Sequence, residues 1–122
     1  MDKIRVLLAD DHIIVREGTR EFIQREPDME VVAEAGDGEE AISLAVGLKP
    51  DVVVMDIRMP TMSGIDTTRR IRKIHPDLPI IAQTAYAQIS DRKQALDCGC
   101  NDYISKPIEA AELYSLIAKY LT

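Results

Sequence analysis

Short apolar runs alternate with longer amphipathic segments along the whole chain, and this alternation limits the folds that are open to it. Most runs are rich in Val and Ile and lack the strict apolar–polar alternation of a sheet with one solvated face. They cover Ile4–Ala9, Val31–Ala33, Val52–Met55, Ile80–Gln83 and Asp102–Ser105. Runs of this kind are typical of parallel strands that are covered on both faces.

The segments between the runs carry apolar residues at helical spacing. Such residues recur over 15–23, 41–48, 71–74 and 113–121. A short helix is also expected between Ser90, as its N-cap, and Gly99. Asp37 and Glu40 form a candidate capping box before the second helix. The pattern therefore predicts five strands and five helices in regular alternation.

The order of these elements predicts a doubly wound α/β domain. Right-handed crossovers between parallel strands put helices on both faces of an open sheet. The length of 122 residues suits one domain, and the 46% of hydrophobic residues are enough for a core. We therefore expect a single domain over residues 1–122.

Charge and composition exclude several classes of function. The net charge of −6 disfavours direct binding of nucleic acid through its phosphates. No apolar run approaches the roughly 20 residues that cross a bilayer, and no signal peptide is visible, so we expect a cytoplasmic protein without membrane contact. Cys98 and Cys100 fit no metal motif and are expected to be reduced packing residues. His12 and His75 are interpreted as surface or capping residues rather than ligands.

Polar residues stand at the carboxyl ends of the expected strands, where ligands bind in sheets of this class. Asp10 and Asp11 follow the first strand, Asp56 the third and Lys106 the fifth, while Thr84 ends the fourth. Three neighbouring carboxylates repel one another and call for a cation, and an all-oxygen site favours Mg²⁺. Such a set suits phosphoryl transfer, in which Asp carboxylates act as nucleophiles. Asp56, alone on the middle strand of the set, is the expected acceptor.

Four motifs occur in order along the chain: Asp10-Asp11, the Asp56…Met59-Pro60…Gly64 loop, Thr84-Ala85 and Tyr103…Lys106-Pro107. Together they resemble the receiver domain of two-component response regulators, the CheY-like superfamily, over essentially the whole chain. The resemblance implies a flavodoxin-like sheet in the order 2-1-3-4-5. It also implies a signalling domain that catalyses only its own phosphorylation and dephosphorylation.

The resemblance further implies a role for each acidic residue. Asp56 would accept a phosphoryl group from a phosphohistidine on a histidine kinase or a histidine phosphotransfer protein. Asp11 and Asp56 would ligate Mg²⁺ directly, together with the backbone carbonyl oxygen of Arg58. Asp10 would help to hold the ion, often through water.

The remaining motif residues would act on the phosphorylated state. The resemblance implies that Lys106 pairs with Asp56 and then with the phosphoryl oxygens, while Thr84 and Tyr103 move together as a switch. Their motion would shift the fourth helix, fifth strand and fifth helix, the face for partner binding and for a homodimer.

Two further positions are expected to tune the lifetime of the phosphorylated state. Arg58 and Tyr86 lie two residues after Asp56 and Thr84, at positions that vary in the family and affect hydrolysis of the acyl phosphate. Both side chains are large enough to screen the site from water. We therefore expect slow loss of the phosphoryl group.

Two alternative functions differ in class from the leading one. A phosphatase with an aspartyl nucleophile would carry a second acidic residue two positions after it, where this chain has Arg58. A phosphorylation-independent interaction module would not need the expected site residues.

The stretches 11–18 and 55–60 resemble regulators with a C-terminal DNA-binding domain, whereas 83–87 and 99–108 resemble receivers of hybrid histidine kinases. The output partner is therefore open, as is the choice between a natural and a recombined chain.

Overall fold

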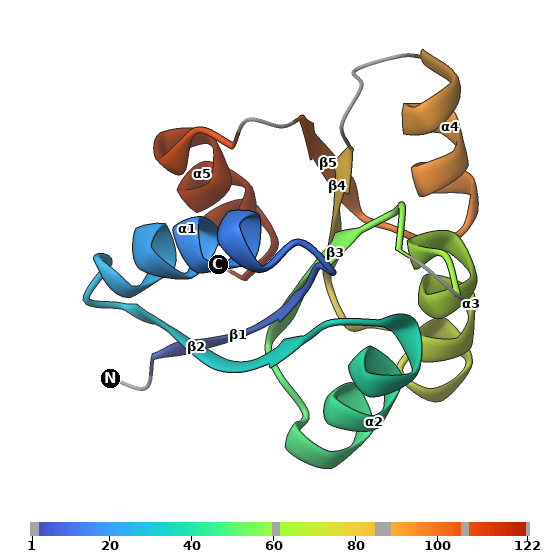
Figure 1. Cartoon of the computed structure of the whole chain (residues 1–122), viewed down its shortest axis with the longest axis horizontal. Helices are drawn as coiled ribbons and strands as arrows, with labels where there is room; N and C mark the ends of the chain where they lie inside the picture. Colours follow the sequence, from blue (N-terminus) through green and yellow to red (C-terminus); the bar gives the residue numbers. More distant parts are fainter. Residues whose placement is uncertain (1–2, 60–61, 85–88, 106–107, 122) are drawn as a thin grey trace.

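The computed structural model describes residues 3–59, 62–84, 89–105 and 108–121, in which five strands alternate with five helices (Figure 1). The strands are β1 (Ile4–Ala9), β2 (Met29–Ala35), β3 (Val52–Asp56), β4 (Ile80–Thr84) and β5 (Asp102–Ser105). The helices are α1 (Ile13–Gln24), α2 (Gly38–Leu48), α3 (Gly64–Ile74), α4 (Ile89–Asp97) and α5 (Ala110–Leu121).

The strands form one parallel sheet in the order β2-β1-β3-β4-β5. Helices α1 and α5 cover one face, and α2, α3 and α4 cover the other (Figure 1). Each face has its own apolar core, because successive side chains of a strand point to opposite faces. On β3, for example, Val53 packs on the side of α2 and α3, while Val54 packs on the side of α1 and α5. The predicted doubly wound α/β fold and its strand order are confirmed.

The bounds of several elements differ from those expected from apolar runs. Strand β2 extends beyond Val31–Ala33 at both ends, because its backbone pairs with all of β1, including Ile4 with Met29. Asp56 and Thr84 are the last residues of β3 and β4. The expectation that Ser90 caps the fourth helix is wrong, since α4 begins at Ile89. Hydrogen bonding thus continues past the point where the apolar pattern stops.

The capping box predicted before the second helix is present in the structure. Asp37 Oδ1 accepts a hydrogen bond from the N–H of Glu40 at 2.8 Å, and Glu40 Oε1 accepts one from the N–H of Gly36 at 3.1 Å. Ser63 caps α3 in the same way by accepting from the N–H of Asp66. These caps satisfy N–H groups that have no partner within the helix.

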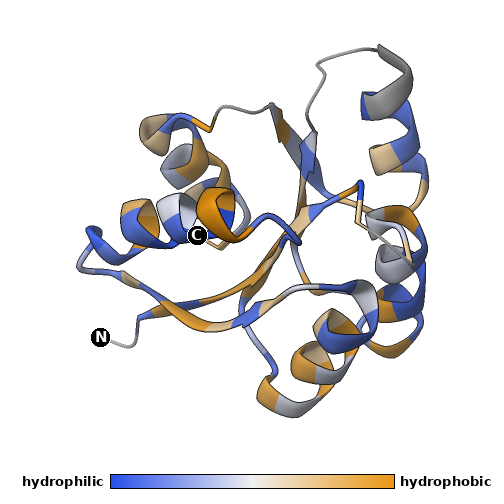
Figure 2. Cartoon of the chain, in the orientation of Figure 1, coloured by the Kyte–Doolittle hydropathy of each residue, from blue (hydrophilic) through white to orange (hydrophobic). Residues whose placement is uncertain are grey.

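Helix α1 buries only part of its apolar residues. Thr19 and Ile23 are buried against the sheet, whereas Ile13 and Ile14 are exposed. Figure 2 shows the first turn of α1 in the colour of hydrophobic residues. Val15, expected to belong to the buried stripe, is also exposed. Among the described helices, none is long and apolar enough to cross a membrane.

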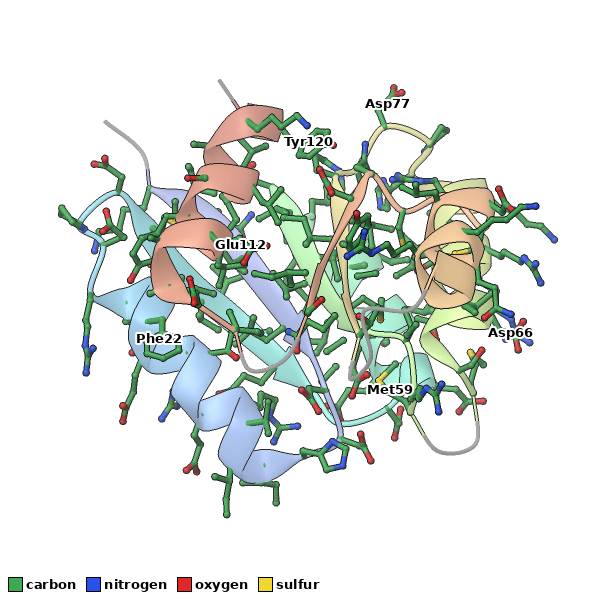
Figure 3. All side chains as sticks on the ribbon, turned by 90° about the horizontal axis from the view of Figure 1, so that it is seen from above. Phe22, Met59, Asp66, Asp77, Glu112 and Tyr120 are labelled. Atoms are coloured by element: carbon green, nitrogen blue, oxygen red, sulfur yellow. The ribbon has the colours of Figure 1, made fainter. Side chains whose placement is uncertain are left out.

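Hydrogen bonds join α5 to α1 and to the start of β5. The Tyr114 hydroxyl donates to the carbonyl oxygen of Phe22 on α1. At the other end of α5, the Tyr120 hydroxyl lies 2.8 Å from the carbonyl oxygen of Asn101 and 2.9 Å from Asp102 Oδ2 at the start of β5. Figure 3 shows Phe22 beside α5 and Tyr120 near the end of that helix.

Candidate functional site

Four side chains, three from the turn between β1 and α1 and one from the end of β3, meet at the carboxyl edge of the sheet. Asp10, Asp11, His12 and Asp56 each contribute one ligand-type atom, and these atoms all lie within 4.8 Å of one another. Asp10 and Asp56 are buried, Asp11 is half-buried and His12 is exposed. The acidic residues that the sequence singled out are thus brought together by the neighbouring strands β1 and β3.

Asp10 is anchored through its backbone and its carboxylate. Its N–H donates to the carbonyl oxygen of Ala35 at 3.0 Å, and its own carbonyl oxygen accepts from Arg16 Nη1 at 2.8 Å. Asp10 Oδ1 accepts a hydrogen bond from the N–H of His12 at 2.8 Å. The turn from β1 into α1 is therefore organised around this carboxylate.

Asp56 is oriented by the loop that follows it. Its Oδ1 accepts a hydrogen bond from the N–H of Arg58 at 3.0 Å, an Asx-type turn. The next residue, Ile57, donates its N–H to the carbonyl oxygen of Gln83 at 3.2 Å, which ties the loop to β4. The Arg58 side chain is exposed. These bonds hold the Asp56 carboxylate at the carboxyl edge of the sheet. Only 2% of the residue is exposed there.

His12 contacts the carboxylates with its ring. The residue occupies the N-cap position of α1 and is exposed, as expected, but its side chain makes no capping hydrogen bond. Its Nδ1 lies 3.2 Å from Asp10 Oδ1, 3.3 Å from Asp11 Oδ1 and 3.8 Å from Asp56 Oδ2. Sequence reasoning missed this contact, because spacing does not say where an exposed ring points. His75, in contrast, lies at the C-cap of α3, as its interpretation as a capping residue anticipated.

Thr84 and Tyr103 lie on neighbouring strands and on the same face of the sheet. Thr84 pairs with Ser105, and Tyr103 pairs with Ala82, so the two residues are offset by two positions across the ladder. Thr84 is buried, and among the described residues its Oγ1 has no hydrogen-bond partner. The Tyr103 ring lies 4.7 Å from Arg92 Cζ of α4. Lys106 and Tyr86, the other two expected site residues, lie outside the described residues.

The donor set fits a hard divalent cation. Three carboxylates in close proximity repel one another, and a cation between them offsets that repulsion. Asp11 Oδ1 is a buried atom that accepts no hydrogen bond from any described group, although it faces the His12 ring. Carboxylate oxygens are the ligands that Mg²⁺ prefers, which makes Asp10, Asp11 and Asp56 able to hold this ion.

The cysteines take no part in this cluster. Cys98 and Cys100 are free and buried, with their sulfur atoms 3.9 Å apart. They pack at the end of α4 and the start of β5, where Cys100 also contacts the Thr68 hydroxyl. Their expected role as reduced packing residues is consistent with this placement.

The sheet order and the carboxylates at its edge define the class as a CheY-like α/β domain, and comparison with known proteins gives the family. A model of the response regulator receiver domain matches residues 6–118. The chain therefore belongs to the response regulator receiver family and is a receiver domain of two-component signalling.

Curated relatives support this membership over most of the chain. The transcriptional regulatory protein LiaR of Bacillus subtilis is 41% identical over 114 residues, which are 93% of this chain and 54% of LiaR. The response regulator protein VraR of Staphylococcus aureus is 36% identical over 116 residues, which are 95% of this chain and 56% of VraR. The chain spans about half the length of these relatives.

Solved structures agree with the fold. A LuxR-family two-component response regulator from Aurantimonas sp. superposes with a TM-score of 0.92 at 39% identity, covering 98% of this chain and 86% of that one. The response regulator domain of Thermotoga maritima CheB gives a TM-score of 0.91 at 36% identity, covering 98% of this chain and 96% of that one.

Proposed function

We propose that this receiver domain accepts a phosphoryl group on Asp56 from the phosphohistidine of a histidine kinase or a histidine phosphotransfer protein. The observation that carries the proposal is the position of the Asp56 carboxylate at the end of β3, with ligand atoms of Asp10 and Asp11 within 4.8 Å. Residues 1–122 are proposed to form a single domain.

Asp56 is suited to in-line attack because one of its oxygens is held in place. Oδ1 takes the hydrogen bond from the N–H of Arg58, which fixes the orientation of the carboxylate. A carboxylate oxygen of Asp56 forms the new bond to phosphorus while the bond between phosphorus and the donor imidazole nitrogen breaks. The released imidazole takes a proton from solvent. Holding the nucleophile in one orientation removes part of the entropic barrier.

Mg²⁺ would be held by Asp10, Asp11, Asp56 and the carbonyl oxygen of Arg58. When bound there, it would offset the negative charge of the phosphoryl group. The chain's own contribution is to hold the three carboxylates close together at the carboxyl edge of the sheet. Lys106 is proposed as the second positive charge at the site, and it lies outside the described residues.

The switch would join Thr84 to the face formed by α4, β5 and α5. The Thr84 hydroxyl, which has no partner among the described residues, is available to bond a phosphoryl oxygen. Tyr103 is its partner in the switch, and its contact with Arg92 joins β5 to α4. A phosphoryl group that bonds Thr84 in only one arrangement would favour that arrangement, as a population shift requires.

This face is also the proposed surface for a downstream partner or a homodimer. The chain itself is proposed not to bind nucleic acid, since its net charge is −6. Relatives such as a DNA-binding LuxR-family response regulator from Staphylococcus aureus, at 27% identity and a TM-score of 0.89, suggest a DNA-binding output in a longer protein. A cytoplasmic location is part of the same proposal.

The experiment that tests the acceptor is intact-mass analysis after incubation with acetyl phosphate and Mg²⁺. We expect the mass of one added phosphoryl group on the wild type and none on Asp56→Asn or after chelation of the ion. Asp77→Asn is the matched control, because Asp77 is exposed and lies in the α3–β4 loop, away from the cluster (Figure 3). Full labelling of Asp56→Asn would contradict the acceptor assignment, and rapid turnover of phosphate esters would favour a phosphatase.

The lifetime of the phosphorylated state tests the proposed roles of Arg58 and Tyr86. Both side chains are proposed to screen the acyl phosphate from water. Arg58→Asn combined with Tyr86→Ser should therefore speed dephosphorylation, measured as the decay of the phosphorylated mass after removal of the donor. An unchanged decay would remove both residues from this role.

A further inference from the structure

The ring of His12 stands where three carboxylates converge. Its Nδ1 lies 3.2 Å, 3.3 Å and 3.8 Å from one oxygen each of Asp10, Asp11 and Asp56. A nitrogen with one proton makes one good hydrogen bond, and Asp10 Oδ1 already accepts from the backbone N–H of His12 at 2.8 Å. A single hydrogen bond from Nδ1 therefore engages only one of the three oxygens around this nitrogen.

The distances from Nδ1 to the three oxygens are in the range for atoms that share one metal ion. Ligand atoms at about 2.1 Å from a metal are roughly 3.0 Å apart at a right angle, about 3.4 Å apart at a tetrahedral angle and about 4.2 Å apart when opposite. The distances from Nδ1 to Asp10 and Asp11 lie between the first two values, and the distance to Asp56 lies between the last two. Nδ1 thus has the spacing of a fourth ligand.

We propose that His12 Nδ1 is a nitrogen ligand of this site and widens its preference from Mg²⁺ toward transition-metal ions such as Co²⁺ and Ni²⁺. The inference rests on the metal site of the proposed function. Imidazole nitrogen suits Co²⁺, Ni²⁺ and Zn²⁺, whereas Mg²⁺ takes oxygen ligands. Coordination uses the Nδ1 lone pair, with the ring proton on Nε2.

Exposure of the ring allows the site to serve both kinds of ion. The His12 side chain is 61% exposed, so it can turn toward solvent and leave the carboxylates to Mg²⁺. The Asp10 and Asp56 side chains, at 2% and 3% exposed, lack that freedom. His12 therefore determines which ion is preferred, while the carboxylates determine that an ion is bound at all.

The test compares Co²⁺ and Mg²⁺ affinities by calorimetry, without any phosphodonor. In His12→Ala we expect the Co²⁺ affinity to fall at least 10-fold, on the order of a lost ligand contact, and the Mg²⁺ affinity to change less than about 3-fold. His75→Ala is the matched control, since it removes the only other histidine in the sequence and should change neither affinity.

A second measurement observes the ligand itself. In the Co²⁺-loaded wild type, proton NMR should show a strongly shifted, exchangeable imidazole N–H signal that is absent from His12→Ala. The proposal is overturned if that signal is missing, if the wild type does not bind Co²⁺, or if both affinities fall or rise together in His12→Ala. If the Co²⁺ affinities and the NMR signal are as expected but Asp56 takes up no phosphoryl group, only the proposed acceptor is overturned.

Discussion

A Cβ atom on Gly64 would lie 2.2 Å from the backbone carbonyl oxygen of Asp56 and 2.5 Å from Cα of Ile57. Helix α3 therefore begins against the end of β3 at a distance that only glycine allows. The N–H of Gly64 also donates to the carbonyl oxygen of Ile57 at 3.1 Å, which closes the loop. The residue that permits this close approach thus supports the position of the Asp56 carboxylate.

Replacement of Gly64 by Ala should destabilise the domain and impair its phosphorylation. The obstacle is backbone rather than a flexible side chain, so we expect a loss of about 2–3 kcal/mol in the free energy of unfolding, measured with urea. Gly47→Ala is the control, because nothing lies within 4 Å of its Cβ position in α2, and it should gain about 0.5–1 kcal/mol. Equal effects of the two changes would refute the role given to Gly64.

Thr84→Val should stabilise the unphosphorylated domain while weakening its phosphorylated state. Val keeps the shape of Thr and removes a buried hydroxyl that has no partner among the described residues. A buried unsatisfied group costs roughly 1–3 kcal/mol, so a gain of about 1 kcal/mol is expected in urea unfolding. Thr84→Ser keeps the hydroxyl and should retain the response to acetyl phosphate. A loss of stability in Thr84→Val would mean that the hydroxyl is already satisfied.

Arg92→Gln should weaken the contact between α4 and β5. The guanidinium lies over the Tyr103 ring, and such cation–π contacts contribute about 0.5–1 kcal/mol when partly exposed. We expect a loss of this size in thermal or urea unfolding, and no further loss when Arg92→Gln is added to Tyr103→Leu. Lys93→Gln, at the exposed neighbouring position, should be neutral. Additive losses in the double variant would exclude the pair as an energetic contact.

The stability of the domain should fall at alkaline pH through Tyr120. Partial burial and the hydrogen bond to Asp102 raise the pKa of Tyr120 above its ordinary value of 10.0. The unfolded state therefore loses the phenol proton first, and the contribution of this hydroxyl is complete below pH 10 and lost as the pH rises toward the folded pKa. Unfolding measured between about pH 9 and 11 should show a smaller loss in Tyr120→Phe than in the wild type. The same loss in both proteins would assign it to other groups.

Much of the candidate site could be predicted because it follows from two simple rules. The apolar runs locate the strands, and the carboxyl ends of parallel strands share an edge. These rules led to Asp10, Asp11 and Asp56, which the structure brings within 4.8 Å of one another. Their chemical roles stay predictions.

Other features could not be derived from spacing. The capping role of Ser90 was wrong because α4 begins at Ile89, so Ser90 lies inside the helix rather than before it. The contact of His12 with the carboxylates depends on the direction of an exposed ring, for which the sequence carries no periodic signal. The place of Thr84 at the end of the fourth strand was expected, but its hydroxyl's lack of a partner among the described residues depends on every group packed around it.

The sequence by itself determined the order of strands and helices, the α/β class and the acidic residues of the site, because periodicity and strand ends are local properties of the chain. Only the tertiary structure decided how His12 meets the carboxylates that follow β1 and end β3, how closely Gly64 approaches Asp56, and how Arg92 covers Tyr103. These are contacts between side chains and backbone from different elements, and their distances are set by the packing of the helices on the sheet.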